Sequence, residues 1–214
     1  MSDVKRREYS SPVRAAQAAA NRAAIVRAAH RLFVAQGYAG TTVDQIAAAA
    51  GVSKPTVFSS VGNKAEVFKV VRDVAFAGDD DPTPVARRPS VDKARAAPDL
   101  AAAVRALAEH MLGLCRRAAE VQEVLRGAAS GDPAMRELWA TSEDQRLAGA
   151  GFFAEILAGK LRPKVSRAKA ADALWVIMAP DNYLRLVLVR GWSDRAYRAW
   201  LETNIMAQLY GTHP

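Results

Sequence analysis

The feature that most constrains the fold of this chain is a series of helix-length segments, each opened by a capping residue and closed by glycine or proline. The first covers residues 13–36, which contain neither proline nor glycine, and Gly37 follows as a candidate C-cap. The second opens at Thr42, where Gln45 three residues later completes a capping box. Alanine is abundant, and no segment alternates apolar and polar residues as a strand would. The sequence therefore predicts an all-α fold.

Further capping and breaking residues place the remaining helices. Ser53 opens a short third helix with Pro55 in its first turn, where no intrahelical donor is lost. Gly62 ends this helix, and residues 63–77 form a fourth. Pro180 should kink or split the helix that contains it. The later helices are expected over residues 98–117, 120–129, 133–159, 167–190 and 194–210.

Positive charge is concentrated in the first third of the chain. Residues 1–72 hold 11 Lys and Arg against 4 Asp and Glu, whereas residues 73–214 hold 19 against 18. A local basic surface is what the neutralisation of nucleic-acid phosphates requires, although a solvated basic face or tail gives the same count. Residues that fit either contacts to flanking DNA or simple solubility are Lys5, Arg6, Arg7, Arg14 and Arg22.

Two of the short helices meet at residues 50–53 in the proportions of a helix-turn-helix. Gly51 permits a tight turn there, and Ile46, Val52 and Val57 can pack the two helices together. An exposed second helix has the shape that enters the major groove of DNA. Taken alone, this pattern is as typical of an ordinary helical hairpin.

A longer run of residues around this turn is more specific. In order, it contains Leu32-Phe33, Gly37-Tyr38, Thr41-Thr42-Val43, Ile46-Ala47, Ala50-Gly51-Val52-Ser53 and Thr56-Val57-Phe58, followed by Lys64 and Glu66. Over about residues 21–71 this run resembles the DNA-binding domain of the TetR family of bacterial regulators. The resemblance implies a homodimer of about nine helices per subunit, in which three N-terminal helices bind DNA and a variable C-terminal domain binds a small effector.

The resemblance also implies roles for individual residues. Thr42 stands where a hydroxyl at the start of the second helix meets a phosphate, and Lys64 matches a phosphate-binding lysine. Lys54 and Thr56 lie at the start of the recognition helix, in reach of base edges or sugar-phosphate. Phe58 replaces the usual tyrosine, so a phenolic hydrogen bond to phosphate cannot form. The candidate DNA contacts are Thr42, Ser53, Lys54, Pro55, Thr56, Phe58, Ser59 and Lys64.

The domain organisation follows from these motifs and from a change of composition after residue 77. Residues 78–97 contain three prolines and a run of three aspartates, and we interpret them as a loop with at most one short helical turn. The predicted parts are a flexible basic arm at 1–13, a helix-turn-helix DNA-binding domain at 14–62, a connecting helix at 63–77 and a helical effector-binding and dimerisation domain at 78–214.

The later helices carry the expected sensing and pairing functions. By resemblance, the last two helices of each subunit form the dimer interface, and an intramolecular core is the alternative for the same apolar stripe. This stripe comprises Tyr197, Trp200, Leu201, Ile205 and Leu209. The candidates for an effector pocket are aromatic, soft or amide side chains, although such residues are also typical of a plain core. They are Met111, Cys115, Trp139, Phe152, Phe153, Trp175 and Asn182.

Together these features predict a transcriptional regulator, a repressor that a small and largely hydrophobic effector releases from palindromic double-stranded operator DNA. The alternative is a DNA-binding protein without a small-molecule switch, either architectural or gated by a partner protein.

Other classes of protein have little support in the sequence. His30, His110 and His213 are scattered and Cys115 is the single cysteine, which provides neither zinc-ligand spacing nor a Cys–His catalytic pair. We therefore expect no enzymatic activity, no cofactor and no metal. The absence of a secretory signal and of an apolar run of about 18 residues, together with the lone cysteine, predicts a cytoplasmic protein with no membrane partner.

Overall fold

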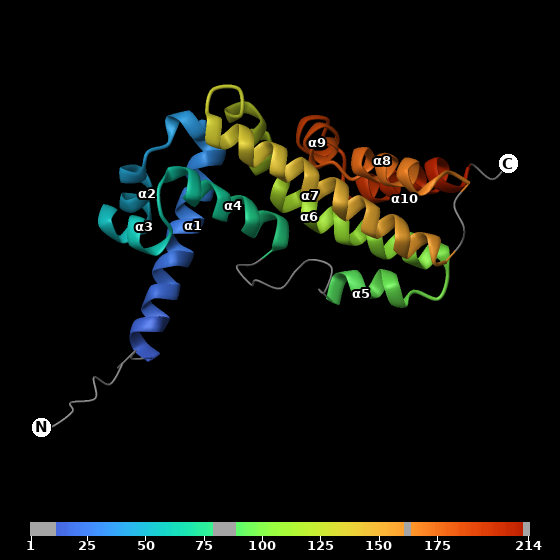
Figure 1. Cartoon of the computed structure of the whole chain (residues 1–214), viewed down its shortest axis with the longest axis horizontal. Helices are drawn as coiled ribbons and strands as arrows, with labels where there is room; N and C mark the ends of the chain where they lie inside the picture. Colours follow the sequence, from blue (N-terminus) through green and yellow to red (C-terminus); the bar gives the residue numbers. More distant parts are fainter. Residues whose placement is uncertain (1–11, 79–88, 161–163, 212–214) are drawn as a thin grey trace, which may run out of the picture. The chain divides into compact units, whose positions relative to one another are not determined.

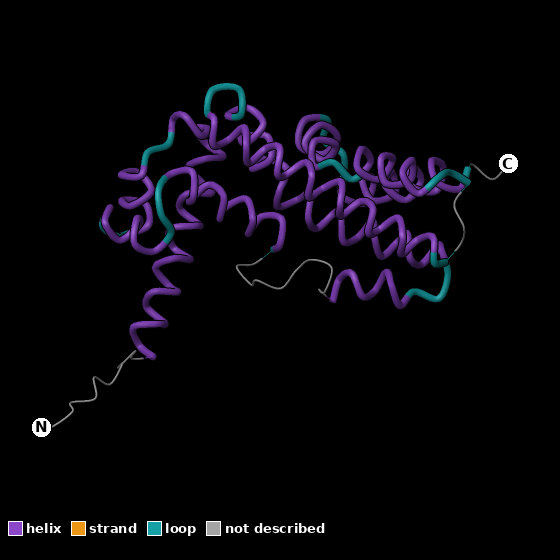
Figure 2. The backbone as a smooth tube through the Cα atoms, viewed as in Figure 1, coloured by secondary structure: helices purple, strands orange, loops and turns teal. Residues whose placement is uncertain are grey.

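The computed structural model describes residues 12–78, 89–160 and 164–211, and every regular element within those ranges is a helix (Figure 1). Figure 2 shows the same result as long helical stretches joined by short loops. The all-α prediction is confirmed. Contacts between Cα atoms divide the chain into two compact units, Met1–Val71 (unit 1) and Arg72–Pro214 (unit 2). None of the helices in the described ranges is both long enough and apolar enough to cross a lipid bilayer.

Unit 1 contains α1 (Pro12–Gly40), α2 (Val43–Ala50), α3 (Lys54–Ser60) and the first half of α4 (Lys64–Ala77). Helix α1 contacts both α2 and α3, which also contact each other. The three interhelical contacts enclose a small core, so each helix buries one face against the other two.

The core of unit 1 is built around aromatic and branched side chains with no exposed surface. The ring of Phe33 stacks on Tyr38 with centroids 5.8 Å apart and meets the edge of Phe68 at 4.9 Å. Burial of each such side chain contributes about 1.5–3 kcal/mol, and aromatic pairing adds to this. The fully buried core residues include Ile25, Phe33, Ile46, Val57 and Phe68.

Both ends of α1 have a clear local cause. Gly37 has a φ of 74° and a ψ of 172°, so the regular helix is interrupted where the sequence predicted its end. The helix begins at Pro12, a residue that the first turn of a helix tolerates, so the last two residues of the predicted arm at 1–13 are helical instead. Residues 1–11, with the basic group Lys5, Arg6 and Arg7, lie outside the described residues.

Unit 2 is organised around α6 (Leu100–Ala128), which contacts α5, α7, α9 and α10. Helices α6 and α7 lie side by side along much of their length, and α8 and α10 pack against them (Figure 1). The core between them is apolar, with Leu107, Leu125, Leu157 and Leu174 almost completely buried. The other elements are α5 (Pro89–Ala96), α7 (Pro133–Ala158), α8 (Arg167–Ile177), α9 (Pro180–Tyr183), a π-helix (Leu184–Val189) and α10 (Asp194–Tyr210).

Two predictions about secondary structure were wrong. The helices expected at 98–117 and 120–129 form the single helix α6, because Ala118 and Ala119 between them are buried helix formers and nothing there breaks the hydrogen-bond ladder. The second half of the loop expected at 78–97 forms α5, while residues 79–88 lie outside the described ranges. Helix α5 buries Val91 and Ala94, three residues apart on one helical face.

The break expected at Pro180 is confirmed. Helix α8 ends at Ile177, and Pro180 opens α9 at a position where a missing N–H costs no hydrogen bond. The side-chain amide of Asn182 donates to the carbonyl oxygens of Val176 (2.7 Å) and Ile177 (3.1 Å). These bonds satisfy carbonyl groups that the end of α8 leaves without intrahelical partners.

Candidate nucleic-acid interface and cavity

The turn between α2 and α3 is set by one glycine. Gly51 adopts the left-handed conformation, with a φ of 69° and a ψ of 30°, and its N–H donates to the carbonyl of Ala48 at 3.2 Å. The next N–H, of Val52, donates to Ala47 at 3.0 Å. These bonds close the end of α2 and turn the chain directly into α3, because glycine carries no Cβ that would oppose a positive φ.

Side-chain caps hold the starts of both helices. The hydroxyl of Thr42 accepts from the N–H of Gln45 at 3.2 Å, and Gln45 Oε1 accepts from the N–H of Thr42 at 2.8 Å, which confirms the predicted capping box. The hydroxyl of Ser53 accepts from the N–H of Thr56 at 3.3 Å. Helix starts of this kind point backbone N–H groups outward, where an anion such as a phosphate can bind.

The outer side of α3 is open to solvent. Ser53, Lys54, Pro55 and Ser59 are exposed, and Phe58 leaves 47% of its surface accessible, whereas Val57 on the inner side has none. Thr56 is half-buried, and its hydroxyl lies 2.7 Å from that of Ser53. A helix held on one side and bare on the other has the form needed to enter a groove of DNA.

The structure adds a charged partner that sequence reasoning missed. Lys54 Nζ lies 2.9 Å from Asp44 Oδ2, and both side chains remain at least half exposed. Asp44 stands in the first turn of α2, so the ion pair ties the start of the recognition helix to the start of its neighbour. The sequence shows this acidic residue two positions after Thr42, but its pairing with Lys54 depends on the geometry of the turn.

Lys64 and Arg22 are also positioned by specific contacts. Lys64 Nζ lies 4.2 Å from the centroid of the Tyr38 ring, a cation–π geometry that holds the ammonium group near the start of α4. The guanidinium of Arg22 donates to the carbonyl of Ser60 at 3.3 Å, which satisfies a carbonyl at the end of α3. Arg14, by contrast, is exposed on α1.

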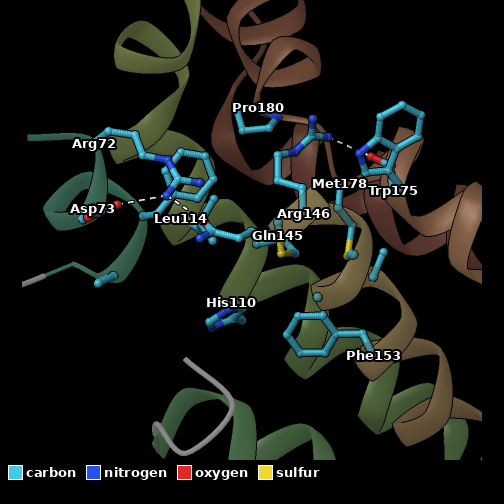
Figure 3. A pocket seen from close by; sticks show the side chains of 15 residues that line it. Arg72, Asp73, His110, Leu114, Gln145, Arg146, Phe153, Trp175, Met178 and Pro180 are labelled. Atoms are coloured by element: carbon cyan, nitrogen blue, oxygen red, sulfur yellow. Dashed lines mark hydrogen bonds and ion pairs between the residues drawn. The ribbon is translucent and has the colours of Figure 1, made fainter. Parts of the chain in front are cut away.

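Unit 2 contains a cavity of about 270 Å³ with mainly apolar walls (Figure 3). Three of the seven predicted pocket residues line it, namely Met111, Phe153 and Trp175. Phe76 of α4 and Pro180 of α9 complete parts of the wall. The lining residues come from α4, α6, α7, α8 and α9. The cavity therefore lies between packed helices and has mainly apolar walls, as ligand sites commonly do.

Arg72 is the most buried charged group in this wall, with 5% of its surface accessible. One terminal nitrogen donates to Asp73 (2.9 Å) and Gln145 (2.8 Å), and the other donates to Ser142 (2.9 Å). Its guanidinium also lies 4.5 Å from the ring centroid of Phe76. The Nε–H group is buried and has no hydrogen-bond partner.

A second arginine, Arg146, also lines the cavity. Arg146 donates to both carboxylate oxygens of Glu143 at 2.6 and 2.8 Å and to the carbonyl of Trp175 at 2.9 Å. Its guanidinium lies 5.6 Å from the Trp175 ring centroid, and Figure 3 shows the two side chains next to each other. The indole Nε1–H of Trp175 is buried and has no partner. The wall therefore carries two unsatisfied donors, on Arg72 and Trp175.

Sequence reasoning missed both arginines. Arg72 lies four residues after the fully buried Phe68, and Arg146 lies four residues before the fully buried Ala150. Residues four apart share a helix face, so each arginine occupies an otherwise buried position. An arginine on an apolar helix face was the signal that could have identified them.

The other predicted pocket residues do not line this cavity. Trp139 and Phe152 are half-buried, and Asn182 caps α8 as described above. Cys115 is fully buried, with its sulfur 3.8 Å from the hydroxyl of Tyr197, which donates to it. Burial raises the pKa of the Cys115 thiol to about 12, so the thiol is protonated at neutral pH.

The apolar stripe of α10 belongs to the core of the chain. Tyr197, Leu201, Ile205 and Leu209 have no exposed surface, so they pack within the subunit, as the alternative in the sequence analysis held. Trp200 is half-buried and stacks on Tyr197 with centroids 5.7 Å apart. The large apolar side chains that do face solvent in unit 2 include Val176, Leu188, Val189 and Trp192.

Comparisons with known proteins agree with the helix-turn-helix. The model of the bacterial regulatory proteins of the tetR family matches residues 25–71, which include the turn and all of α2 and α3. No curated protein sequence matches this chain.

Solved structures extend the similarity beyond the matched segment. NalD, the secondary repressor of the MexAB-OprM multidrug efflux pump in Pseudomonas aeruginosa, is 20% identical, with a TM-score of 0.63, over 91% of this chain and 98% of its own. A protein from Saccharomonospora viridis in complex with choline is 19% identical, with a TM-score of 0.64, over 88% and 96%. At such identities these structures show a shared fold. The match over residues 25–71, together with the exposed recognition helix, identifies this chain as a DNA-binding transcriptional regulator whose helix-turn-helix matches that of the tetR family of bacterial regulatory proteins.

Proposed function

We propose that this regulator is a repressor, which binds a palindromic operator as a homodimer and leaves it when a small, largely hydrophobic effector fills the cavity of unit 2. The observation that carries the proposal is the position of α4. Val67, Phe68 and Val71 of this helix are buried in unit 1, while Arg72 and Phe76 of the same helix line the cavity. A ligand that moves the second half of α4 would act on a helix that belongs to both units.

The exposed side of α3 supports the DNA-binding part of the proposal. Lys54 and Thr56 stand at the start of the helix, where side chains reach base edges, and Thr42 and Lys64 flank them as candidate phosphate contacts. Phe58 can pack against a sugar, since 47% of its surface is exposed. Phosphate contacts of this kind orient a protein on the duplex, whereas base contacts give sequence preference.

The cavity supports a small-molecule switch. Its walls are mainly apolar with a few polar groups, which is the usual composition of ligand sites. Among proteins with this fold, one was solved with choline bound and another is a repressor, so the fold is compatible with both roles. The effector must bind the DNA-free conformer more tightly than the DNA-bound one, typically by about 5–150-fold.

The homodimer part rests on symmetry and on exposed apolar surface. One recognition helix reads few bases, and a two-fold axis would place two copies about 34 Å apart on the operator. Val176, Leu188, Val189 and Trp192 are exposed in unit 2 and would gain free energy if a second subunit covered them. The stripe of α10 then supports the interface from within, as buried core.

The test begins with selection of bound sequences from a random DNA pool by the full chain. We expect a palindromic consensus, a complex with two chains per duplex, and affinity at least about a thousandfold above that for random DNA at physiological salt. Small apolar molecules that raise the thermal stability of the protein should then lower operator affinity in a binding titration. A small specificity ratio would indicate an architectural protein, and stabilising ligands without effect on DNA would remove the switch.

A further inference from the structure

We infer that the cavity of unit 2 selects an apolar molecule that ends in a carboxylate, with the Nε–H of Arg72 as the donor that binds the carboxylate. This inference rests on the proposed function, since it names the chemistry of the effector. Apolar walls determine the body of the ligand, and two unsatisfied donors in the wall determine its polar end (Figure 3).

The size of the cavity limits the body of the ligand. A volume of about 270 Å³ corresponds to a ligand of about ten non-hydrogen atoms, if each takes about as much space as one liquid water. Phe76, Phe153 and Trp175 provide aromatic surface, and Met111 and Met178 provide side chains that adapt to the shape of a ligand. A phenyl ring or a short alkyl chain of this size fits such walls.

The hydrogen bonds of Arg72 leave Nε as its one nitrogen atom without an acceptor. Three donor contacts go to Asp73, Gln145 and Ser142, while Nε has none. A buried donor without an acceptor is costly, and an ionised acceptor makes a stronger bond with a guanidinium than a neutral one does. Arg72 is 5% exposed and lines the cavity, so a ligand in the cavity is the acceptor that we assign to Nε. The indole Nε1–H of Trp175 offers a second donor in the same wall.

The charges in the wall determine the sign of the ligand. Arg72 and Arg146 both line the cavity, and the one carboxylate in its lining is that of Asp73. Arg146 is already paired with both carboxylate oxygens of Glu143, so Arg72 is the cation that a ligand can neutralise. The Asp73 side chain is 42% exposed, so solvent screens its share in neutralising Arg72. A cationic ligand would meet two guanidinium groups without a free carboxylate to pair with, and burial of an unpaired charge is costly. An anion, in contrast, receives a charge-assisted hydrogen bond.

The first experiment compares head groups on one body, by isothermal titration of the full-length protein in the absence of DNA at pH 7. The probes are 3-phenylpropionate, 3-phenylpropanamide, 3-phenylpropan-1-ol and 3-phenylpropylammonium, with octanoate and octylammonium as a second body. We expect the carboxylates to bind at least about tenfold more tightly than the neutral probes, and the ammonium compounds more weakly still. Equal affinity across head groups, tighter binding of a cation, or no binding of either carboxylate would overturn the inference.

The second experiment locates the head group. R72K keeps the charge but removes the Nε–H, and we expect it to lower carboxylate affinity about tenfold while it leaves the weak binding of the alcohol unchanged. R167K is the matched control, because Arg167 is an exposed arginine of the same unit. If R72K does not fold, as its thermal unfolding would reveal, W175F still removes a donor while keeping an aromatic ring. Unchanged carboxylate affinity in every folded variant would contradict the assignment.

DNA release is measured separately, so that the two claims can fail separately. Carboxylates that bind through Arg72 without lowering operator affinity would leave the inference standing and remove the proposed switch. Release of DNA by a neutral or cationic molecule that binds the cavity more tightly than the carboxylates would overturn the inference and leave the proposed switch standing.

Discussion

The two units of this regulator place their functional side chains in different ways. In unit 1 the candidate DNA contacts fall within residues 42–64, and hydrogen bonds between residues three apart hold the helix starts that carry them. In unit 2 the cavity wall draws on five helices, and Arg72 is held by Ser142, 70 residues away in sequence. A functional surface on one short motif can be inferred from local signals, whereas a cavity depends on tertiary packing.

The largest expected effect tests how far the exposed motif of unit 1 depends on its small core. We expect F33A to lower the free energy of unfolding by about 3–5 kcal/mol and to abolish operator binding, because Phe33 is fully buried between Tyr38 and Phe68. Urea unfolding followed by circular dichroism measures the first effect, and a DNA titration measures the second.

F58A is the matched control for this change. Phe58 is also an aromatic residue of unit 1, but 47% of its surface is exposed. Its removal should change stability by about 0.5 kcal/mol or less and act on DNA affinity alone. Equal destabilisation by F33A and F58A would mean that the outer side of α3 is not free, and the comparison between the units would fail.

Much of the fold could be predicted because its boundaries have local causes. Each of these boundaries is set by a residue that acts on the backbone only a few positions away. They are the capping box of Thr42 and Gln45, the left-handed Gly51, the N-cap Ser53 and Pro180. The helix α5 was missed because its one proline and three charged residues outnumber the two residues that it buries, Val91 and Ala94. Its stability is tertiary, which a local pattern does not reveal.

The same distinction between local and tertiary causes separates the DNA contacts of unit 1 from the cavity residues of unit 2. All candidate DNA contacts on α3 except Thr56 are exposed, as a motif read from sequence implied. In unit 2 an apolar helix face can turn toward a cavity or toward the core, and composition does not distinguish them. Met111 faces the cavity while Cys115, one turn later, is buried against Tyr197. The stripe of α10 belongs to the core for the same reason.

A second prediction sharpens the comparison on the DNA side. We expect K54A to weaken operator binding by about 1–3 kcal/mol and to relax sequence preference at one base pair, since Lys54 stands exposed at the start of α3. K93A, which removes an exposed lysine from α5 in unit 2, should leave binding unchanged. Affinities for the selected operator and for a scrambled duplex decide the matter. An equal loss on both duplexes would assign Lys54 to phosphate contacts.

A third prediction concerns the turn itself. We expect G51A to destabilise the protein by about 1–2 kcal/mol, because its φ of 69° strains any residue with a Cβ. G127A should instead stabilise it by about 0.5–1 kcal/mol, because Gly127 lies in α6 with nothing within 4 Å of an added Cβ. Thermal unfolding of the two variants should therefore shift in opposite directions. A shift in the same direction would show that the turn does not require a positive φ.

The smallest expected effect concerns the ion pair between Lys54 and Asp44. Since both side chains are at least half exposed, D44N should change stability by about 0.5 kcal/mol or less. D44N should act mainly on DNA affinity, because it removes a negative charge beside the recognition helix and frees Lys54 Nζ to contact the duplex. We expect affinity for random DNA to rise about twofold at low salt and the gain to fade as salt screens the charge. D92N on α5 breaks a comparable exposed pair with Arg95 and should leave DNA affinity unchanged. If D44N instead weakened operator binding, Asp44 would position Lys54 for the operator rather than compete with DNA for it.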